Sequence, residues 1–360
     1  TGRILASWLR YTNAGRQATV WGWVDALADD HLLRSVELCA MAGWAKLNLG
    51  QYGAIEDWVS EAERELGTGS HIDAATIRSH RDRHLGRTDA ALAWGREAVE
   101  RAAGLDSTSA IAARTAAGVA AFWAGAPEST ALLEGALADS ADDAETSSFV
   151  MSASYLAMVA ADAGDHDTAL MRAGAALARC ETEDRERHHL PTMAHLALAS
   201  IAIDDGRLRE AGIHLADALR LAIIAREPLQ RVRIDLLGAR LAHRLGDADE
   251  ARSRLRGALR RTGALRGENA VAALVRDATN ELRFAPRPDQ DALPPGARDL
   301  TERELEVLRM LPSGMTRTEL AEELCVSVNT IKTHLTAISR KLGARGRTQV
   351  LEQARELGLL

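Results

Sequence analysis

The sequence predicts an all-α protein made of two parts, a helical solenoid followed by a small helix-turn-helix domain. Three observations lead to this expectation. Glycines recur at intervals of 35 to 42 residues as far as Gly246, each between two apolar stretches. Aromatic residues make up only 4% of the 360 residues and hydrophobic residues 46%, as expected of helices that pack through small side chains. The last 61 residues change in character and contain a series of short, capped helices with a basic segment.

The repeat is marked by glycine at positions 15, 50, 86, 125, 164, 206 and 246. Four of the seven units have alanine five residues after the glycine, and five have alanine twelve residues after it. Two small residues seven positions apart lie on one helical face, where they let a neighbouring helix approach closely. Seven helix-turn-helix units of this kind are expected to stack into a solenoid that covers residues 1–283.

Three segments of the repeat also carry a family resemblance. They read LGRTDAALAWGREAVERA from Leu85, AGDHDTALMRAGAALARC from Ala163 and LGDADEARSRLRGALRRT from Leu245. Each is similar to the turn and second helix of the tetratricopeptide repeat. The intervals here exceed the family's usual period of about 34 residues, which indicates a longer and looser relative. What the resemblance implies is a tetratricopeptide-like solenoid with a concave surface for a partner or effector.

A proline-rich segment, FAPRPDQDALPPGARD, follows the repeat at residues 284–299. Four of the eight prolines of the chain fall within it, so it cannot be helical throughout. We expect it to be a semi-rigid linker between the solenoid, residues 1–283, and a C-terminal domain, residues 300–360.

Each predicted helix of the C-terminal domain begins after a hydroxyl side chain that is able to cap it. The caps and helices are Thr301 before 302–311, Thr316 before 317–324 and Ser327 before 328–342. Glu304 stands at the third position of the first helix and completes a capping box with Thr301. A short helix, a tight turn and a longer helix make a helix-turn-helix pattern.

The third of these helices has two distinct faces. A predicted buried stripe comprises Val328, Ile331, Leu335, Ile338 and Leu342, and a second, polar face comprises Asn329, Thr333, Thr336 and Arg340. Lys332 and Lys341 flank the polar face, and residues 324–351 contain five basic residues and no acidic one, although the net charge of the chain is −7. Such a face suits the base edges and phosphates of double-stranded DNA. The alternative from the pattern alone is an ordinary amphipathic helix with a solvated face.

The C-terminal domain resembles the DNA-binding domain of LuxR-type transcriptional regulators. The motifs are LTERELEVL, Gly314, TELAEEL, VSVNTIKTHL, RKLGA, Arg347 and a terminal LGLL. The resemblance implies a four-helix domain whose third helix enters the major groove. It assigns groove contacts to Lys332, Thr333 and Thr336, and phosphate contacts to Thr330, Lys341 and Arg347. It also implies that the fourth helix, 347–359, pairs two subunits on DNA. The apolar residues expected at that homodimer contact are Val350, Leu351, Ala354 and Leu357.

The pairing of this repeat with this domain is similar to the large ATP-dependent LuxR regulators, which carry a nucleotide-binding module ahead of the solenoid. The sequence has no glycine-rich phosphate loop ending in Gly-Lys-Ser or Gly-Lys-Thr. It begins with Thr1, inside what reads as a helix. We therefore expect a fragment or processed form, with no cofactor in this chain and any ATP site upstream of Thr1.

All seven tryptophans precede residue 124. Burial in the core of the repeat is the plain interpretation, because stacked helices must bury such large side chains. The functional alternative is an aromatic-lined groove for a small effector, with Trp44, Trp58, Trp94 and Trp123 as its residues. The HRDRH segment, with His80 and His84 four residues apart, has metal-ligand spacing but no evident third ligand. We interpret it as a solvated polar face, and no metal or catalytic site is expected.

Three widely spaced cysteines, Cys39, Cys180 and Cys325, argue against a disulfide framework and for a reducing compartment. No stretch approaches 18 uncharged apolar residues. The sequence thus predicts a cytoplasmic, non-enzymatic regulator that binds double-stranded DNA as a homodimer and senses an effector or protein partner through the solenoid. The alternative is a protein-interaction scaffold within a larger ATP-dependent switch.

Overall fold

A computed structural model describes residues 17–26, 36–66, 72–105, 108–140, 146–182, 190–225, 227–264, 270–282, 300–311, 315–324 and 326–356. Two compact units are present, Thr1–Phe284 and Ala285–Leu360. Every regular element in the described ranges is a helix, which confirms the predicted all-α class. In this part of the chain no helix is both long and apolar enough to cross a membrane. The expected linker, 284–299, lies outside the described residues.

The first unit is a row of helix pairs. The pairs are α4 (Val36–Asn48) with α5 (Ile55–Leu66), α6 (Ile72–His84) with α7 (Thr88–Arg101), α8 (Thr108–Ala124) with α9 (Ser129–Asp139), α10 (Thr146–Asp162) with α11 (His166–Thr182), α12 (Thr192–Asp204) with α13 (Leu208–Ala225), and α14 (Pro228–Arg244) with α15 (Ala248–Ala264). A short 3₁₀ helix, η1 (Tyr52–Ala54), precedes α5, while α2 (Gln17–Asp25) and α16 (Ala270–Leu282) lie at the two ends of the row.

The repeated glycines make the turns within these pairs. Gly50, Gly86, Gly125, Gly164, Gly206 and Gly246 all have φ between 70° and 80°, a left-handed conformation that side chains disfavour. At Gly86, the Arg87 amide donates to the carbonyl of Asp82 at 2.8 Å and ends α6. The glycine spacing therefore identified the turns correctly; Gly15 lies outside the described residues.

Eight of the nine alanines predicted to face neighbouring helices are buried, and the side chain of Ala62 lies outside the described residues. The eight are Ala91, Ala98, Ala169, Ala176, Ala211, Ala218, Ala251 and Ala258, each at most 2% exposed. Gly95 shows how close the helices come, since a Cβ built there stands only 2.8 Å from the Cα of Ala117 in α8. Small residues thus set the spacing of the stack, as the pattern predicted.

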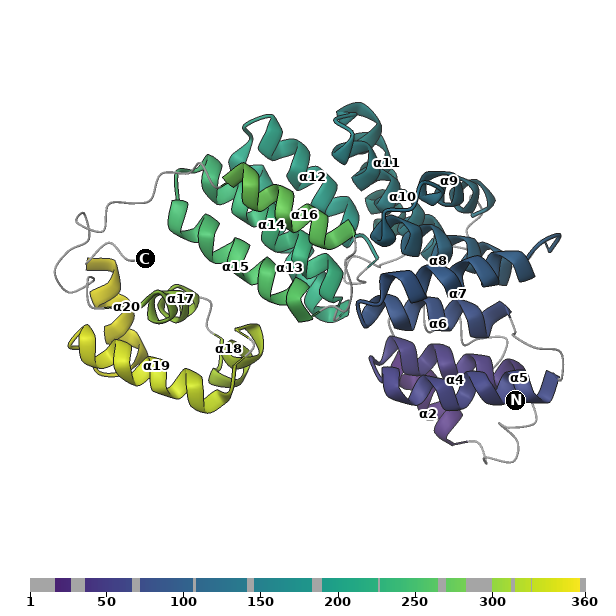
Figure 1. The fold of residues 1–360 in the computed structure, drawn as a ribbon, viewed down its shortest axis with the longest axis horizontal. Helices are drawn as coiled ribbons and strands as arrows, with labels where there is room; N and C mark the ends of the chain where they lie inside the picture. Colours follow the sequence, from purple (N-terminus) through teal and green to yellow (C-terminus); the bar gives the residue numbers. More distant parts are fainter. Residues whose placement is uncertain are drawn as a thin grey trace. The chain divides into compact units, whose positions relative to one another are not determined.

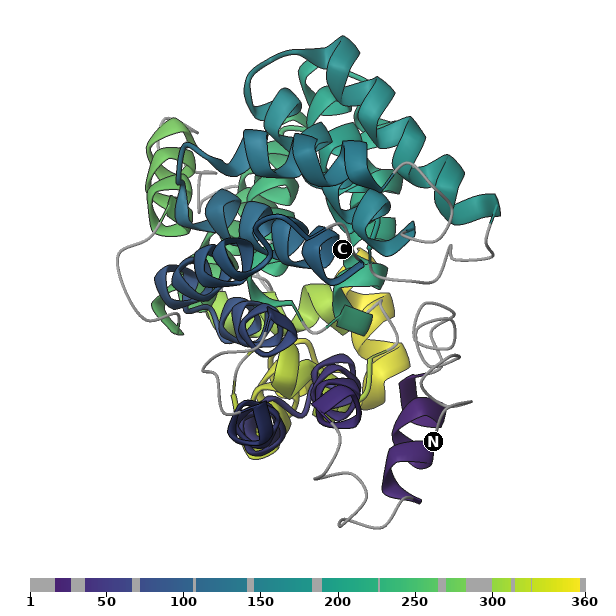
Figure 2. The ribbon, with the colours of Figure 1, turned by 90° about the vertical axis from the view of Figure 1, so that its right-hand side faces the viewer.

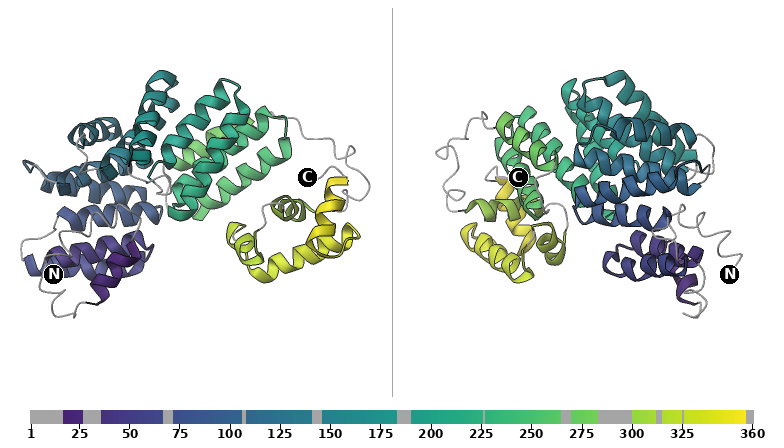
Figure 3. Two further views of the ribbon diagram at one scale, coloured as in Figure 1. Left: turned by 180° about the vertical axis from the view of Figure 1, so that it is seen from behind. Right: turned by 45° about the vertical axis from the view of Figure 1, so that its right-hand side comes forward.

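The first helices of successive pairs stack on one another, from α4 through α6, α8, α10, α12 and α14 to α16 (Figures 1 and 2). The row also curves back on itself, because α6 touches α14 and α8 touches α16. The back view in Figure 3 shows the same succession of helices. Such a curved row of helix pairs is a solenoid of the tetratricopeptide-like kind that the sequence predicts.

The second unit contains α17 (Glu302–Met310), α18 (Arg317–Glu323), α19 (Val328–Lys341) and α20 (Gly346–Glu356). The longest helix, α19, touches each of the other three. Apolar side chains from all four, including Leu308, Leu320, Ile338 and Val350, form one buried core. The predicted four-helix domain is therefore present, with α18 and α19 as its helix-turn-helix.

Candidate nucleic-acid interface

Side-chain caps fix the start of each helix in the helix-turn-helix. The Thr301 hydroxyl accepts from the Glu304 amide, and the Glu304 carboxylate accepts from the Thr301 amide at 2.6 Å. The same reciprocal capping box joins Thr316 and Glu319 at the start of α18. At α19, the Ser327 hydroxyl accepts from the Thr330 amide at 3.0 Å. All three caps were predicted correctly, because a capping box is a local pattern.

One face of α19 anchors it in the domain. Ile331 and Ile338 are fully buried, Leu342 is nearly so, and Leu335 is half-buried. Val328 was predicted to belong to this stripe, and that prediction is wrong, because its side chain is 44% exposed. It is the first residue of the helix, next to the cap Ser327.

The opposite face of α19 is exposed to solvent. It presents Asn329, Lys332, Thr333, Thr336 and Arg340, all of them exposed. The Thr333 hydroxyl donates to the carbonyl of Asn329 at 3.0 Å, and the Thr336 hydroxyl donates to that of Lys332 at 2.9 Å. Since each hydroxyl proton is held by the helix, the threonine oxygens face outward as acceptors. The structure therefore brings the predicted groove residues together on one surface.

The residues predicted to contact phosphates are placed differently. Thr330 is half-buried, and its hydroxyl lies 2.8 Å from that of Ser327 at the helix cap. The Lys341 ammonium donates to the Glu304 carboxylate at 2.6 Å, and Arg347 donates to the backbone carbonyls of Met315, at 2.6 Å, and Leu311. Both cations thus already have partners inside the domain.

Glu304 links the start of α17 to the end of α19. Its carboxylate caps α17 and also holds Lys341 in the last turn of α19. Burial acts to raise its pKa, but the hydrogen bonds from Lys341 and Thr301 outweigh burial and hold the pKa below its ordinary value. The Arg303 guanidinium donates to the carbonyl of Leu324, the residue that ends α18, at 2.8 Å. Adjacent residues of α17 therefore fix both helices of the helix-turn-helix.

The predicted dimer contact on α20 needs correction. Val350 is 2% exposed and Ala354 is 0% exposed, so both belong to the core of their own domain and cannot meet a second subunit. Leu351 is half-buried against the same core, and Leu357 lies outside the described residues. The apolar residues of α20 that the structure describes therefore pack mainly in the core of their own domain.

The tryptophans proposed as an effector groove are packing residues. Trp123 is 1% exposed, and its indole donates to the Tyr155 hydroxyl at 2.9 Å, so the effector prediction is wrong for this residue. Trp44, Trp58 and Trp94 are half-buried against core clusters. Their rings also have close neighbours, which are His80 for Trp44, Trp21 for Trp58 and the Arg78 guanidinium for Trp94. The core interpretation of the tryptophans therefore describes them better.

The HRDRH segment is also not the solvated face that we expected. His80, Asp82 and Arg83 are each less than 8% exposed, and Arg83 pairs with the buried Glu227. The His84 Nε2 atom lies 3.2 Å from the same carboxylate. In the described residues no group of three or more metal-ligating side chains comes together. The error has a physical cause, because Glu227 is 144 residues beyond Arg83 and local periodicity cannot reveal it.

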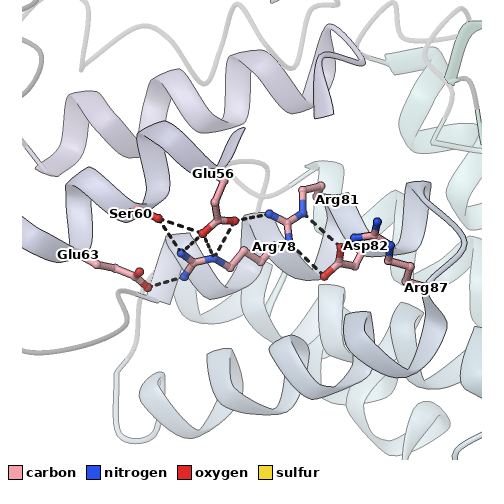
Figure 4. A network of polar contacts seen from close by, with 7 residues as sticks. All are labelled: Glu56, Ser60, Glu63, Arg78, Arg81, Asp82 and Arg87. Carbon is pink, nitrogen blue, oxygen red and sulfur yellow. Dashed lines mark hydrogen bonds and ion pairs between the residues drawn. The ribbon is translucent and has the colours of Figure 1, made fainter. Parts of the chain in front are cut away.

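Next to the HRDRH segment, a network of polar contacts joins α5 and α6 (Figure 4). Arg78 donates to Glu56 at 3.1 Å and to Glu63 at 2.6 Å, while Arg81 bridges Glu56 and Asp82. Burial acts to raise the pKa of Glu56, but the hydrogen bonds from Arg78 and Arg81 lower it to about 2. The network holds two helices of the repeat together and has the character of a structural contact.

The C-terminal unit is similar in sequence to known regulatory proteins. The family model of bacterial regulatory proteins of the luxR family matches residues 298–354. The transcriptional regulatory protein LiaR of Bacillus subtilis is 45% identical over 60 residues, or 17% of this chain and 28% of LiaR. The HTH-type transcriptional regulator MalT of Serratia proteamaculans is 41% identical over 58 residues, or 16% of this chain and 6% of MalT.

Some of the matches are longer than this unit. The HTH-type transcriptional regulator Mb0914c of Mycobacterium bovis is 31% identical over 209 residues, which are 56% of this chain and 21% of that protein. Because this match is longer than Ala285–Leu360, it includes part of the helical repeat. The matched segments span only 6% to 28% of the lengths of these three relatives.

Among solved structures, a Rap protein in complex with Competence and Sporulation Factor aligns with 79% of this chain and 85% of its own. The TM-score is 0.47 and the identity 13%. The C-terminal assignment rests on the sequence family and on the capped helix-turn-helix. Residues 298–354 are thus a DNA-binding domain of the luxR family of bacterial regulatory proteins.

Proposed function

We propose that this chain is a transcriptional regulator that binds operator DNA by placing α19 in the major groove. The observation that carries the proposal is the exposed face of α19, on which Asn329, Lys332, Thr333, Thr336 and Arg340 lie together. A helix with its other face anchored by Ile331 and Ile338 presents these side chains on a fixed surface. The luxR-family match and the names of the relatives support the same role.

The groups on this face have separate chemical tasks. Lys332 and Arg340 supply donors and positive charge for guanine edges or phosphates. The Thr333 and Thr336 oxygens, with their protons held by the helix, accept from the amino groups of adenine or cytosine. Arg345 is exposed and adds charge beyond the helix. Lys341 and Arg347, which the family resemblance assigned to phosphates, must first leave their partners inside the domain.

The test is selection of binding sequences from a random duplex pool with the full chain, followed by affinity measurements at several salt concentrations. We expect one enriched sequence family and a linear fall of log affinity with log salt. Replacing Lys332 or Arg340 by alanine should reduce the salt slope by about one for each phosphate that the chain no longer neutralises. No enrichment, or slopes that do not change in either variant, would count against the proposal.

We further propose that two chains bind together on DNA through α20. With Val350 and Ala354 buried, the contact is assigned to the outer face of α20, where Leu351 is half-buried and Gln349 and Glu352 are exposed. Two-fold symmetric binding would place the half-sites about one helical turn apart, as in other helix-turn-helix dimers. Selected sequences with no inverted repeat would argue for binding as a monomer.

The helical repeat is proposed to receive the signal, from a protein partner or a small effector. Support comes from apolar side chains exposed at equivalent places. Met171 in α11 is 60% exposed and Ile213 in α13 is 55% exposed, and each stands seven residues after the turn glycine of its pair. Coupling to DNA should appear as a change in operator affinity on the order of 1 to 3 kcal/mol when the signal binds. A ligand that binds the repeat without changing operator affinity is not the signal.

A further inference from the structure

Val328 is an exposed apolar side chain at the end of the helix that faces DNA. It is 44% exposed, and within the described residues from Leu300 to Glu356 no other large hydrophobic side chain is exposed. It is the first residue of α19, next to Asn329 and one turn before Lys332. Within the described residues the domain leaves 44% of this side chain exposed, so a ligand can bury it further.

The start of α19 holds Val328 in a defined position. Ser327 caps the helix by accepting from the Thr330 amide at 3.0 Å, and the hydroxyls of the two residues lie 2.8 Å apart. Valine is branched at Cβ, and in a helix it strongly prefers one side-chain rotamer. Ordering it against a ligand therefore loses little conformational entropy. A rigid methyl-bearing group stands beside the polar face.

In a helix-turn-helix, the N-terminal residues of the second helix are those that meet base edges in the major groove. The one apolar group that the major groove offers is the 5-methyl of thymine. We propose that Val328 contacts the 5-methyl group of a thymine in each half-site and so contributes to sequence specificity. This assignment rests on the proposed function, since it requires α19 to lie in the groove.

When Val328 contacts the thymine, its own methyl groups and the 5-methyl group of the base are both removed from water. Burial of one such group changes an affinity by about threefold to fivefold. The effect is smaller than that of a bidentate hydrogen bond, but it depends on a single methyl group of the DNA. Deoxyuridine differs from thymidine only by that methyl, so the contact can be removed from either partner.

The experiment uses sequences selected by the full chain from a random duplex pool. Each thymine of the best site is replaced in turn by deoxyuridine, and dissociation constants are measured for the natural chain, Val328→Ala, Val328→Thr and Thr336→Ala. For the natural chain, one deoxyuridine position per half-site should weaken binding about threefold to fivefold. Val328→Ala should bind thymine and deoxyuridine equally well there, whereas Thr336→Ala should keep the natural ratio.

Val328→Thr keeps the branched shape with one methyl fewer, and it should give an intermediate ratio even if the alanine variant is poorly folded. The assignment is overturned if no thymine position is sensitive to loss of its methyl, or if Val328→Ala and Val328→Thr both keep the full sensitivity. Failure of the natural chain to bind any duplex sequence specifically is a different result, because it overturns the proposed function itself and the assignment with it.

Discussion

At the residue scale, the basic side chains of the C-terminal unit fall into two groups. Lys332, Arg340 and Arg345 are exposed, whereas Lys341 is held by Glu304 and Arg347 by two backbone carbonyls. Sequence alone treats all five as equivalent, because the partners of Lys341 and Arg347 lie more than 30 residues away. The distinction matters, because Lys341 and Arg347, the latter itself exposed, must give up a contact within the domain before they bind phosphate.

Replacing Lys341 by methionine tests this division. The change leaves the nearly buried Glu304 carboxylate without its cation, which should lower the free energy of unfolding by about 1 to 3 kcal/mol. Arg340→Met is the matched control, because an exposed neighbour should change stability by less than about 0.5 kcal/mol. Urea unfolding followed by circular dichroism gives both numbers. Equal stability of the two variants would show that the Lys341 to Glu304 pair is not structural.

Buried histidines make the stability of the repeat depend on pH. Burial, together with the Arg83 charge, lowers the pKa of His84 to about 3, and the same causes lower the pKa of His80. Unfolded chains take up these protons near pH 6.5, where the folded chain does not. The free energy of unfolding should therefore fall from pH 6.5 downward, by about 1.4 kcal/mol per pH unit for each such histidine.

Glu227 acts in the opposite sense over part of this range. Burial raises its pKa, only partly offset by Arg83, so protonation of the folded state at falling pH relieves the cost of its buried charge. The effect of His84 is therefore measured by comparison. Urea unfolding at several pH values gives the slope of the unfolding free energy against pH for the natural chain and for His84→Asn. A smaller slope in the variant between pH 6.5 and 4.5 is expected. An unchanged slope would mean that His84 takes up its proton in the folded chain.

At the element scale, the fold was largely predictable and the buried polar contacts were not. Turn glycines, interface alanines and helix caps are local signals, and each led to the right element. Val328 and the HRDRH segment were misassigned for one common reason, since burial depends on which helices meet. The contact of α6 with α14, which buries Arg83 against Glu227, joins helices 144 residues apart and leaves no trace in local periodicity.

This α6 to α14 contact predicts a large effect from a small change. Glu227→Gln removes one partner of a buried ion pair and should cost about 3 to 5 kcal/mol of unfolding free energy. The double change Arg83→Met with Glu227→Leu should cost less than the single change, because it buries no unpaired charge. Asp139→Asn, which breaks the exposed pair with Arg114, is the control and should cost at most about 1 kcal/mol. A Glu227→Gln change as mild as the control would show that the buried Arg83–Glu227 pair is not important for stability.

The fourth helix, α20, offers a pair of substitutions that separate folding from assembly. Ala354→Asp buries a charge in the domain core and should unfold the C-terminal unit. Leu351→Asp, at a half-buried position, should keep most of the helix content but weaken cooperative binding to two half-sites. Circular dichroism and binding to one-site and two-site duplexes distinguish these results. Unchanged cooperativity in a folded Leu351→Asp chain would place the dimer contact elsewhere.

At the scale of the whole molecule, the chain joins a helical repeat to a luxR-family domain, and we propose that it reads DNA sequence with the exposed face of α19. The most direct test measures affinity of the full chain for its selected site and for random duplex, with and without Thr333→Ala and Thr336→Ala. We expect each substitution to weaken binding to the selected site by about 1 to 3 kcal/mol and to change binding to random DNA little. Equal weakening on both, in variants that remain folded, would contradict sequence reading by this face.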